Sequence, residues 1–131
     1  MPPPYTTPHD AVNGLIEAYR TLNIDEIVQN KDFDIDSRLF WGGLGLPVFP
    51  EQAAESRVAF ETNFRNELRE HMPDYRSVAF SFISEERPQA NFAIVTLDGS
   101  TTDKKAFKLR IPVFHTENGW KVVLHSSYDH L

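Results

Sequence analysis

Beyond Pro73 the sequence alternates apolar and polar residues in four stretches, and this pattern limits the possible folds more than any other feature of the chain. A period of two places every second side chain on the same face of a β-strand. The stretches cover residues 76–86, 91–97, 105–115 and 120–127, and short turn sequences separate them. Because short turns join antiparallel neighbours, we predict one sheet of four antiparallel strands.

The turn between the last two strands contains Asn118-Gly119, the pair most typical of a two-residue hairpin loop. With these two residues as the loop, His115 lies opposite Val122. Pro112 cannot donate to the strand ladder, so we also expect a bulge or an edge segment there, which moves His115 to the other face of the sheet.

One face of the predicted sheet is almost entirely apolar, and we expect it to pack against helices. The other face mixes basic and apolar residues, and it is too apolar for contact with water alone. A second layer is therefore expected there, and a homodimer through the sheet is the simplest way to supply it. The residues of this second face include Phe92, Ile94, Lys108, Arg110, Phe114 and Lys121.

The first half of the chain predicts three helices. Thr7 is a good N-cap for a helix over residues 8–22, because proline occupies the first helical position and Asp10 lies three residues after the cap. A short helix follows over residues 24–29. A long helix begins at Pro50 and is ended by Pro73, with an apolar stripe at Ala53, Phe60, Phe64, Leu68 and Met72.

Residues 32–41 alternate acidic and apolar side chains, which predicts a short strand between the second and third helices. The segment from Trp41 to Phe49 is rich in glycine yet carries large apolar residues, so we expect it to cover another surface. We expect residues 1–6 to form a flexible tail and residues 7–131 to form a single domain.

Composition excludes several classes of function. The chain of 131 residues has no cysteine, which excludes disulfides, zinc–thiolate sites and thiol nucleophiles. Its net charge of -6 makes nucleic acid an unexpected partner. No apolar stretch is long enough to span a membrane, and the N-terminus lacks the basic and apolar parts of a secretory signal. We therefore expect a cytoplasmic protein with no membrane partner.

Two stretches resemble the nuclear-transport-factor-2-like superfamily, and they are LIEAYRTLNIDEIV (residues 15–28) and NGWKVVLHSS (residues 118–127). The first is similar to the opening helices of that superfamily, and the second to the last hairpin of its polyketide-cyclase-like branch. The resemblance implies an α+β fold in which three N-terminal helices pack on a strongly curved antiparallel sheet, the cystatin-like cone. It implies little about function, because this superfamily includes enzymes, binding proteins and immunity proteins.

Tyr19, Asp36 and His115 are the candidates for acid–base catalysis. The resemblance places Tyr19 where ketosteroid isomerase has the tyrosine that donates a hydrogen bond to the developing oxyanion. The position of that enzyme's catalytic Asp corresponds to Leu39, so we do not expect the isomerase reaction, and the nearest carboxylate is Asp36. His115 is a second possible base. The alternatives are a solvated Asp36 and a His115 at the rim of the sheet.

The candidate ligand-binding residues carry aromatic or amide side chains, and the alternative is that the aromatic ones simply form the core. We expect no cofactor and no metal, because Asp32, Asp34 and Asp36 lack the glycine and the closing glutamate of a calcium loop. The candidate ligand-binding residues are Trp41, Phe60, Phe64, Phe82, Asn91 and Trp120.

Three functions fit these features. The first is a protein that binds a small apolar molecule in the cone, including a cofactor-free lyase or isomerase. The second is a dimeric module that binds a protein through the apolar segment from Trp41 to Phe49. The third is a structural or immunity-type protein whose cone is filled by its own side chains.

Overall fold

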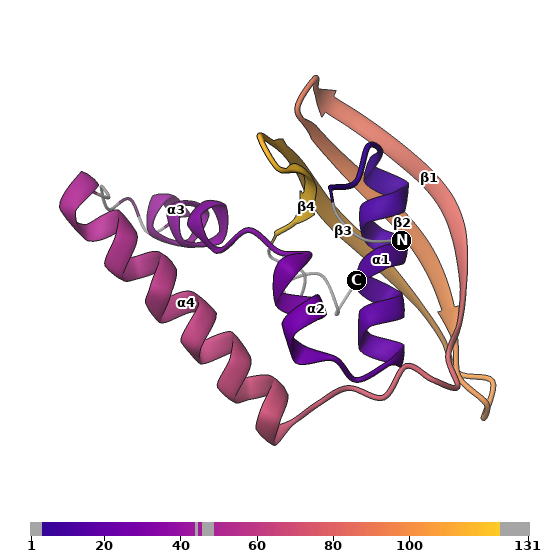
Figure 1. The fold of residues 1–131 in the computed structure, drawn as a ribbon. Helices are drawn as coiled ribbons and strands as arrows, with labels where there is room; N and C mark the ends of the chain where they lie inside the picture. The colour runs from indigo at the N-terminus through magenta and orange to yellow at the C-terminus, as the bar shows by residue number, and fades with distance from the viewer. Residues whose placement is uncertain (1–3, 44, 46–48, 124–131) are drawn as a thin grey trace.

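The computed structural model describes residues 4–43, 45 and 49–123. Four helices precede four strands along the chain (Figure 1). The helices are α1 (Pro8–Arg20), α2 (Ile24–Gln29), α3 (Phe33–Gly43) and α4 (Pro50–Glu70), and the strands are β1 (Ala79–Gln89), β2 (Phe92–Ser100), β3 (Ala106–Thr116) and β4 (Gly119–Val122).

The strands form one antiparallel sheet in the order β1-β2-β3-β4, and α1 crosses its concave face (Figure 1). Apolar side chains of α1 and of the concave face form the core. The prediction of an α+β fold with a strongly curved antiparallel sheet is therefore confirmed. The central core residues are Val12, Leu15, Tyr19, Ala93, Val95, Leu97, Leu109, Ile111, Val113 and Val122.

The register of β3 against β4 differs from the prediction. His115 pairs with Trp120 rather than with Val122, because the two loop residues are Glu117 and Asn118. Gly119 is the first residue of β4, and its φ of 90° suits glycine. A Cβ atom on Gly119 would also lie 2.8 Å from the carbonyl oxygen of Tyr5. Glycine is therefore required at the first residue of β4, next to the loop, rather than in the loop itself.

Of the two irregularities expected at Pro112, the bulge does not occur, and the parity of β3 is kept. The pairing of β2 with β3 runs without a shift through Ile94 and Pro112, so His115 stays on the same face as Val113. Pro112 lies one residue beyond the last pair of β3 with β4, so its missing N–H does not interrupt the pairing of these two strands. A register shift occurs instead in β1, between Phe82 and Ser84.

Residues 33–43 form helix α3, and the prediction of a strand over residues 32–41 is wrong. The carboxylate of Asp32 accepts a hydrogen bond from the backbone N–H of Ile35 at 2.9 Å, as an N-cap residue does. Asp34 and Asp36 lie in the first turn, where the helix dipole favours negative charge. The acidic residues that suggested strand alternation therefore start a helix.

α3 and α4 pack together as a helical hairpin that extends away from the sheet (Figure 1). Leu68, near the C-terminal end of α4, is buried in the core, and Phe64 and Met72 pack against that core. The stripe expected to be buried on α4 is therefore buried at Leu68, whereas Ala53 and Phe60 stay partly exposed. No helix in the described ranges is both long enough and apolar enough to cross a membrane.

Tyr5 lies within the segment that we expected to be a flexible tail, yet its side chain is only 3% exposed. Its carbonyl oxygen accepts a hydrogen bond from the backbone N–H of Trp120 at 3.0 Å. Burial raises the pKa of the Tyr5 phenol. The expectation of a flexible tail therefore does not hold at Tyr5.

Gly14 makes the burial of Tyr5 possible, because a Cβ atom on Gly14 would lie inside the van der Waals radius of the phenol. We predict that Gly14→Ala lowers the free energy of unfolding by about 1–3 kcal/mol, the usual penalty for overpacking. In a Tyr5→Ala background the same change should raise it by up to about 1 kcal/mol, because alanine is the better helix former. Urea unfolding of the four proteins checks this reversal of sign. An unchanged sign would contradict the position of Tyr5, and Asn13→Ala, at an exposed site on the same helix, is the control.

Candidate functional site

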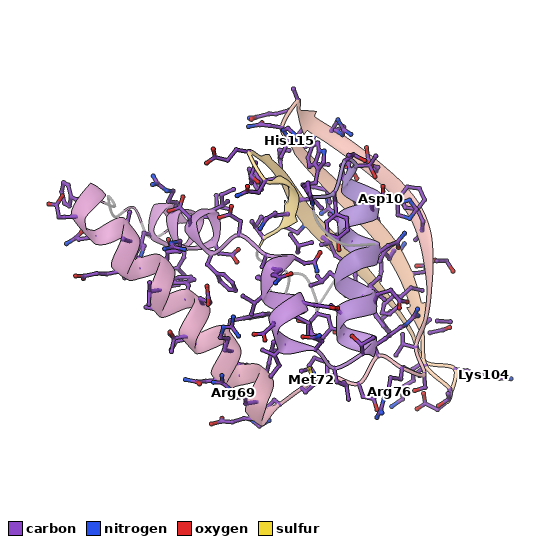
Figure 2. The ribbon with its side chains drawn as sticks, in the orientation of Figure 1. Asp10, Arg69, Met72, Arg76, Lys104 and His115 are labelled. Carbon is purple, nitrogen blue, oxygen red and sulfur yellow. The ribbon has the colours of Figure 1, made fainter. Side chains whose placement is uncertain are left out.

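The structure does not bring Tyr19 and His115 together. The ring of Tyr19 lies 5.2 Å from that of Tyr75, and a chain of ring contacts continues through Phe80 to Phe107 at the start of β3. His115 lies eight residues further along the same strand, about 26 Å away at the usual rise of a strand. Figure 2 shows His115 at the opposite end of the sheet from Arg76, the neighbour of Tyr75.

Asp36 is buried rather than solvated, and it forms an ion pair. Its carboxylate lies 3.0 Å from the ammonium of Lys31, and both side chains are 5% exposed. The Lys31 ammonium also lies 4.9 Å from the centre of the Phe64 ring and 5.7 Å from that of Phe33. A carboxylate held by a cation at this distance is suited to fixing structure rather than to removing a proton from a ligand.

Lys31 was not identified from the sequence, although a signal was present. It is the only basic residue between Arg20 and Arg38, in a stretch of the chain that contains five acidic residues. A single cation among several acids is a reasonable candidate for a buried pair, because buried lysine is rarely found without a partner.

The backbone around Lys31 attaches the start of α3 to the sheet. The carbonyl oxygen of Asn30 accepts a hydrogen bond from the N–H of Val122 at 2.9 Å, and the N–H of Asp32 donates to the carbonyl of Val122 at 3.2 Å. Residues 30–32 thus extend along β4 in a short parallel bridge. The ion pair therefore lies where the helical hairpin leaves the sheet.

His115, Asn91 and Trp120 lie together at the other end of the sheet. The carbonyl oxygen of Asn91 accepts a hydrogen bond from the backbone N–H of His115 at 2.8 Å. The His115 ring lies 5.1 Å from the ring of Trp120, and the guanidinium of Arg87 lies 4.8 Å from the same indole. His115 itself is exposed, whereas Trp120 is buried. This arrangement agrees with the alternative in which His115 is a rim residue.

Phe82 lies on β1, and its side chain is 46% exposed. Its ring lies 4.5 Å from that of His9 near the start of α1.

The other three candidate ligand-binding residues, Trp41, Phe60 and Phe64, lie together on the helical hairpin. The ring of Phe40 contacts those of Trp41 at 5.1 Å and Phe60 at 5.5 Å, and the rings of Phe33 and Phe64 lie 5.5 Å apart. The indole N–H of Trp41 donates a hydrogen bond to the hydroxyl of Ser56 at 2.9 Å. We call Phe33, Phe40, Trp41, Phe60 and Phe64 the hairpin aromatic cluster.

Much of the apolar surface of the helical hairpin is uncovered. The exposed fractions are 40% for Leu39, 45% for Phe40, 52% for Phe49 and 56% for Val58. Exposed large apolar side chains that occur singly are normal on protein surfaces, and these four all belong to the helical hairpin or to its first capping residue. The sequence identified this region as apolar, but not the geometry that leaves it uncovered.

A separate hollow of about 300 Å³ lies beside the β3–β4 turn, and polar residues form most of its lining. It contains none of the candidate site residues. Within the described ranges, no group of three or more His, Cys, Asp or Glu side chains is placed to hold a metal ion. The residues that line the hollow are Pro4, Gln29, Glu117, Asn118 and Lys121.

The fold occurs in proteins of known structure. A phospholipid-binding protein from Ralstonia solanacearum, determined in complex with a phospholipid, is 18% identical to this chain and matches it with a TM-score of 0.60. The match covers 93% of this chain and 80% of that protein. At this identity the likeness concerns the fold alone.

An NTF-2 like protein of unknown function from Shewanella oneidensis MR-1 also matches, with 13% identity and a TM-score of 0.48, over 87% of this chain and 89% of the other. These likenesses concern the fold, which has the α+β arrangement that the sequence resemblance implied. No protein-family model matches the chain, and no curated protein matches it significantly in sequence.

The Lys31–Asp36 pair gives a stability prediction. Lys31→Met should lower the free energy of unfolding by about 3–5 kcal/mol, because it removes the ammonium from a buried carboxylate. The double variant Lys31→Met/Asp36→Leu should recover part of this loss. The matched control is Arg38→Met, which breaks the exposed Arg38–Asp34 pair and should cost at most about 1 kcal/mol. Chemical denaturation measures all three, and equal effects of Lys31→Met and Arg38→Met would contradict the buried pair.

Proposed function

We propose that this protein binds a small apolar or amphiphilic molecule whose hydrocarbon part lies on the hairpin aromatic cluster. The observation that carries this proposal is that Phe40, in the centre of the cluster, contacts both Trp41 and Phe60 and is still 45% exposed. Aromatic rings offer a large apolar area with few rotatable bonds, so covering them with a ligand is favourable at a low entropic cost.

The fold supports an amphiphile as the class of ligand. The phospholipid-binding protein from Ralstonia solanacearum shares the fold over most of both chains, although not the sequence. A molecule with a hydrocarbon chain fits the hairpin aromatic cluster, because the cluster offers ring faces and edges rather than hydrogen-bonding groups. The indole N–H of Trp41, its main donor, is already bonded to Ser56.

A more specific version of this proposal is that the protein is a cofactor-free lyase or isomerase. It needs acid and base groups around one ligand. Tyr19 contacts Tyr75, whose neighbour Arg76 lies at the opposite end of the sheet from His115, and Asp36 is paired with Lys31. Binding without chemistry therefore has the stronger support. The catalytic roles of Tyr19, Asp36 and His115 stay predictions.

Trp41 supplies a direct test of ligand binding. In a Trp120→Phe variant Trp41 is the single tryptophan, and titration with lysophosphatidylcholine below its micelle concentration should shift its emission to shorter wavelength. Phe60→Ala in this background removes apolar area that the ligand would cover, and it should therefore weaken binding at least tenfold. Phe82→Ala, which removes an exposed ring from β1, is the control and should leave the affinity unchanged. Equal weakening by both substitutions, or no spectral shift, would refute the proposal.

A homodimer through the outer face of the sheet is a second candidate, and one contact favours it. The rings of Phe92 and Phe114 stack at 4.6 Å on the face opposite α1, and both are partly exposed. Ile94, on the same face, is also partly exposed. Such a two-fold interface would place the same residues of both copies against each other.

Light scattering checks the dimer. We expect a mass of twice 15.0 kDa for the wild type and a shift toward the monomer for Phe114→Glu, because burying a charge in the interface is costly. Lys108→Glu, at an exposed position of the same strand, is the control for charge alone. A concentration-independent monomer in the wild type would count decisively against this assembly.

A further inference from the structure

The dipeptide Asn-Gly occurs twice in the sequence, at Asn13-Gly14 and at Asn118-Gly119, and the fold places the two copies in different surroundings. Both asparagine side chains are exposed. Asn13-Gly14 lies in the middle of helix α1, whereas Asn118 is a loop residue between β3 and β4 and Gly119 is the first residue of β4. The same dipeptide is therefore present once in a rigid element and once in a turn.

An Asn-Gly pair can undergo a reaction between the asparagine side chain and its own backbone. The glycine nitrogen forms a bond to the side-chain amide carbon, and the side-chain nitrogen takes up the displaced proton and leaves as ammonia. Glycine favours this step because it has no Cβ atom to obstruct the approach. Water then opens the cyclic imide. Opening at the side-chain carbonyl gives aspartate, and opening at the main-chain carbonyl gives isoaspartate, whose main chain is longer by a methylene group.

Helix α1 restrains this reaction at Asn13. The glycine nitrogen reaches the amide carbon only after rotation about the Cα–C bond of the asparagine. Inside an α-helix that rotation breaks the hydrogen bonds of the surrounding turns, because each N–H donates to the carbonyl four residues earlier. Gly14 is the midpoint of α1, and α1 packs its apolar side chains into the core. Reaction at Asn13 therefore requires α1 to unfold locally, which is costly for a helix held by the core.

The same rotation costs less at Asn118. Gly119 forms the last pair of β3 with β4, opposite Thr116, and the ends of elements open more easily than their middles. The Thr116 hydroxyl accepts a hydrogen bond from the N–H of Asn118 at 3.1 Å and donates one to the carbonyl of Gly119 at 2.8 Å. These two bonds involve neither the attacking nitrogen nor the side-chain amide. Asn118 also lines the polar hollow of about 300 Å³, which has room for the water that opens the imide.

We propose that Asn118 deamidates in the folded protein, and that its isoaspartate product detaches the backbone of Tyr5 from the sheet. The carbonyl oxygen of Tyr5 accepts a hydrogen bond from the N–H of Trp120 at 3.0 Å. A Cβ atom on Gly119 would lie only 2.9 Å from the backbone nitrogen of Tyr5. A methylene group inserted directly before Gly119 therefore has no room while this contact persists. The proposed ligand binding does not depend on this modification.

Peptide mapping by mass spectrometry tests the site, with Asn13-Gly14 as the matched control in the same chain. In folded protein kept in mildly alkaline buffer, Asn118 should convert at least about tenfold faster than Asn13, because α1 must open before Asn13 reacts. In concentrated urea the two sites should convert at similar rates, because neither is then held by structure. Asn118→Gln should not convert at this position, because its longer side chain would have to form a larger ring.

Hydrogen exchange of the Trp120 backbone amide tests the consequence for Tyr5. Asn118→Asp carries the new carboxylate on a main chain of unchanged length, so its Trp120 amide should stay as protected as in the wild type. The purified isoaspartate form should lose this protection, because its longer main chain displaces Tyr5. Thermal unfolding verifies that each form is folded.

Several results would overturn the inference. One is an Asn118 that stays intact in the folded protein while the unfolded chain converts. Equal rates at Asn13 and Asn118 in the folded protein would show that conversion proceeds through global unfolding. An isoaspartate form whose Trp120 amide is as protected as that of Asn118→Asp would refute the release of Tyr5.

Discussion

The ion pair between Lys31 and Asp36 is the interaction on which the arrangement of the two parts of this molecule depends. Burying an ammonium costs several kcal/mol unless a counterion and polarisable groups surround it. Asp36 supplies the carboxylate at 3.0 Å, and the rings of Phe33 and Phe64 supply their faces. Phe64 belongs to α4, and the backbone at residues 30–32 runs alongside β4. The contacts that satisfy one buried charge therefore hold the base of the helical hairpin against the sheet.

Beyond this base, the described residues of the hairpin extend away from the sheet. Leu68 reaches the core, but the helices extend away from the sheet beyond that point, and apolar side chains of α3 and α4 remain uncovered. A folded protein normally avoids such exposure, because each uncovered aromatic ring forfeits the free energy of its burial. The proposed ligand would cover these residues, and this exposure distinguishes the hairpin from the tightly packed sheet.

The sheet could be predicted from the sequence because the period of two is unambiguous over four long stretches, and the concave face follows from it. The prediction of secondary structure failed where the same sequence pattern is compatible with two different structures. Asp32, Asp34 and Asp36 alternate with apolar residues as in a strand, yet the same acids cap and open helix α3. Likewise Asn118-Gly119 fits a hairpin loop, but Gly119 pairs with Thr116 in the sheet and lies close against the backbone of Tyr5. Only the tertiary structure supplies that contact.

The candidate site illustrates the same limit at longer range. Trp41, Phe60 and Phe64 are neighbours because α3 and α4 pack as a hairpin, and that packing could not be inferred while residues 32–41 were assigned to a strand. Tyr19 was a candidate through the family resemblance and His115 through its residue type, but the length of β3 separates His115 from the aromatic contacts of Tyr19. Residue type alone thus supplied candidates, and it could not say which of them lie close together. Which of them lie close together is decided by the packing of α3 on α4 and by the length of β3.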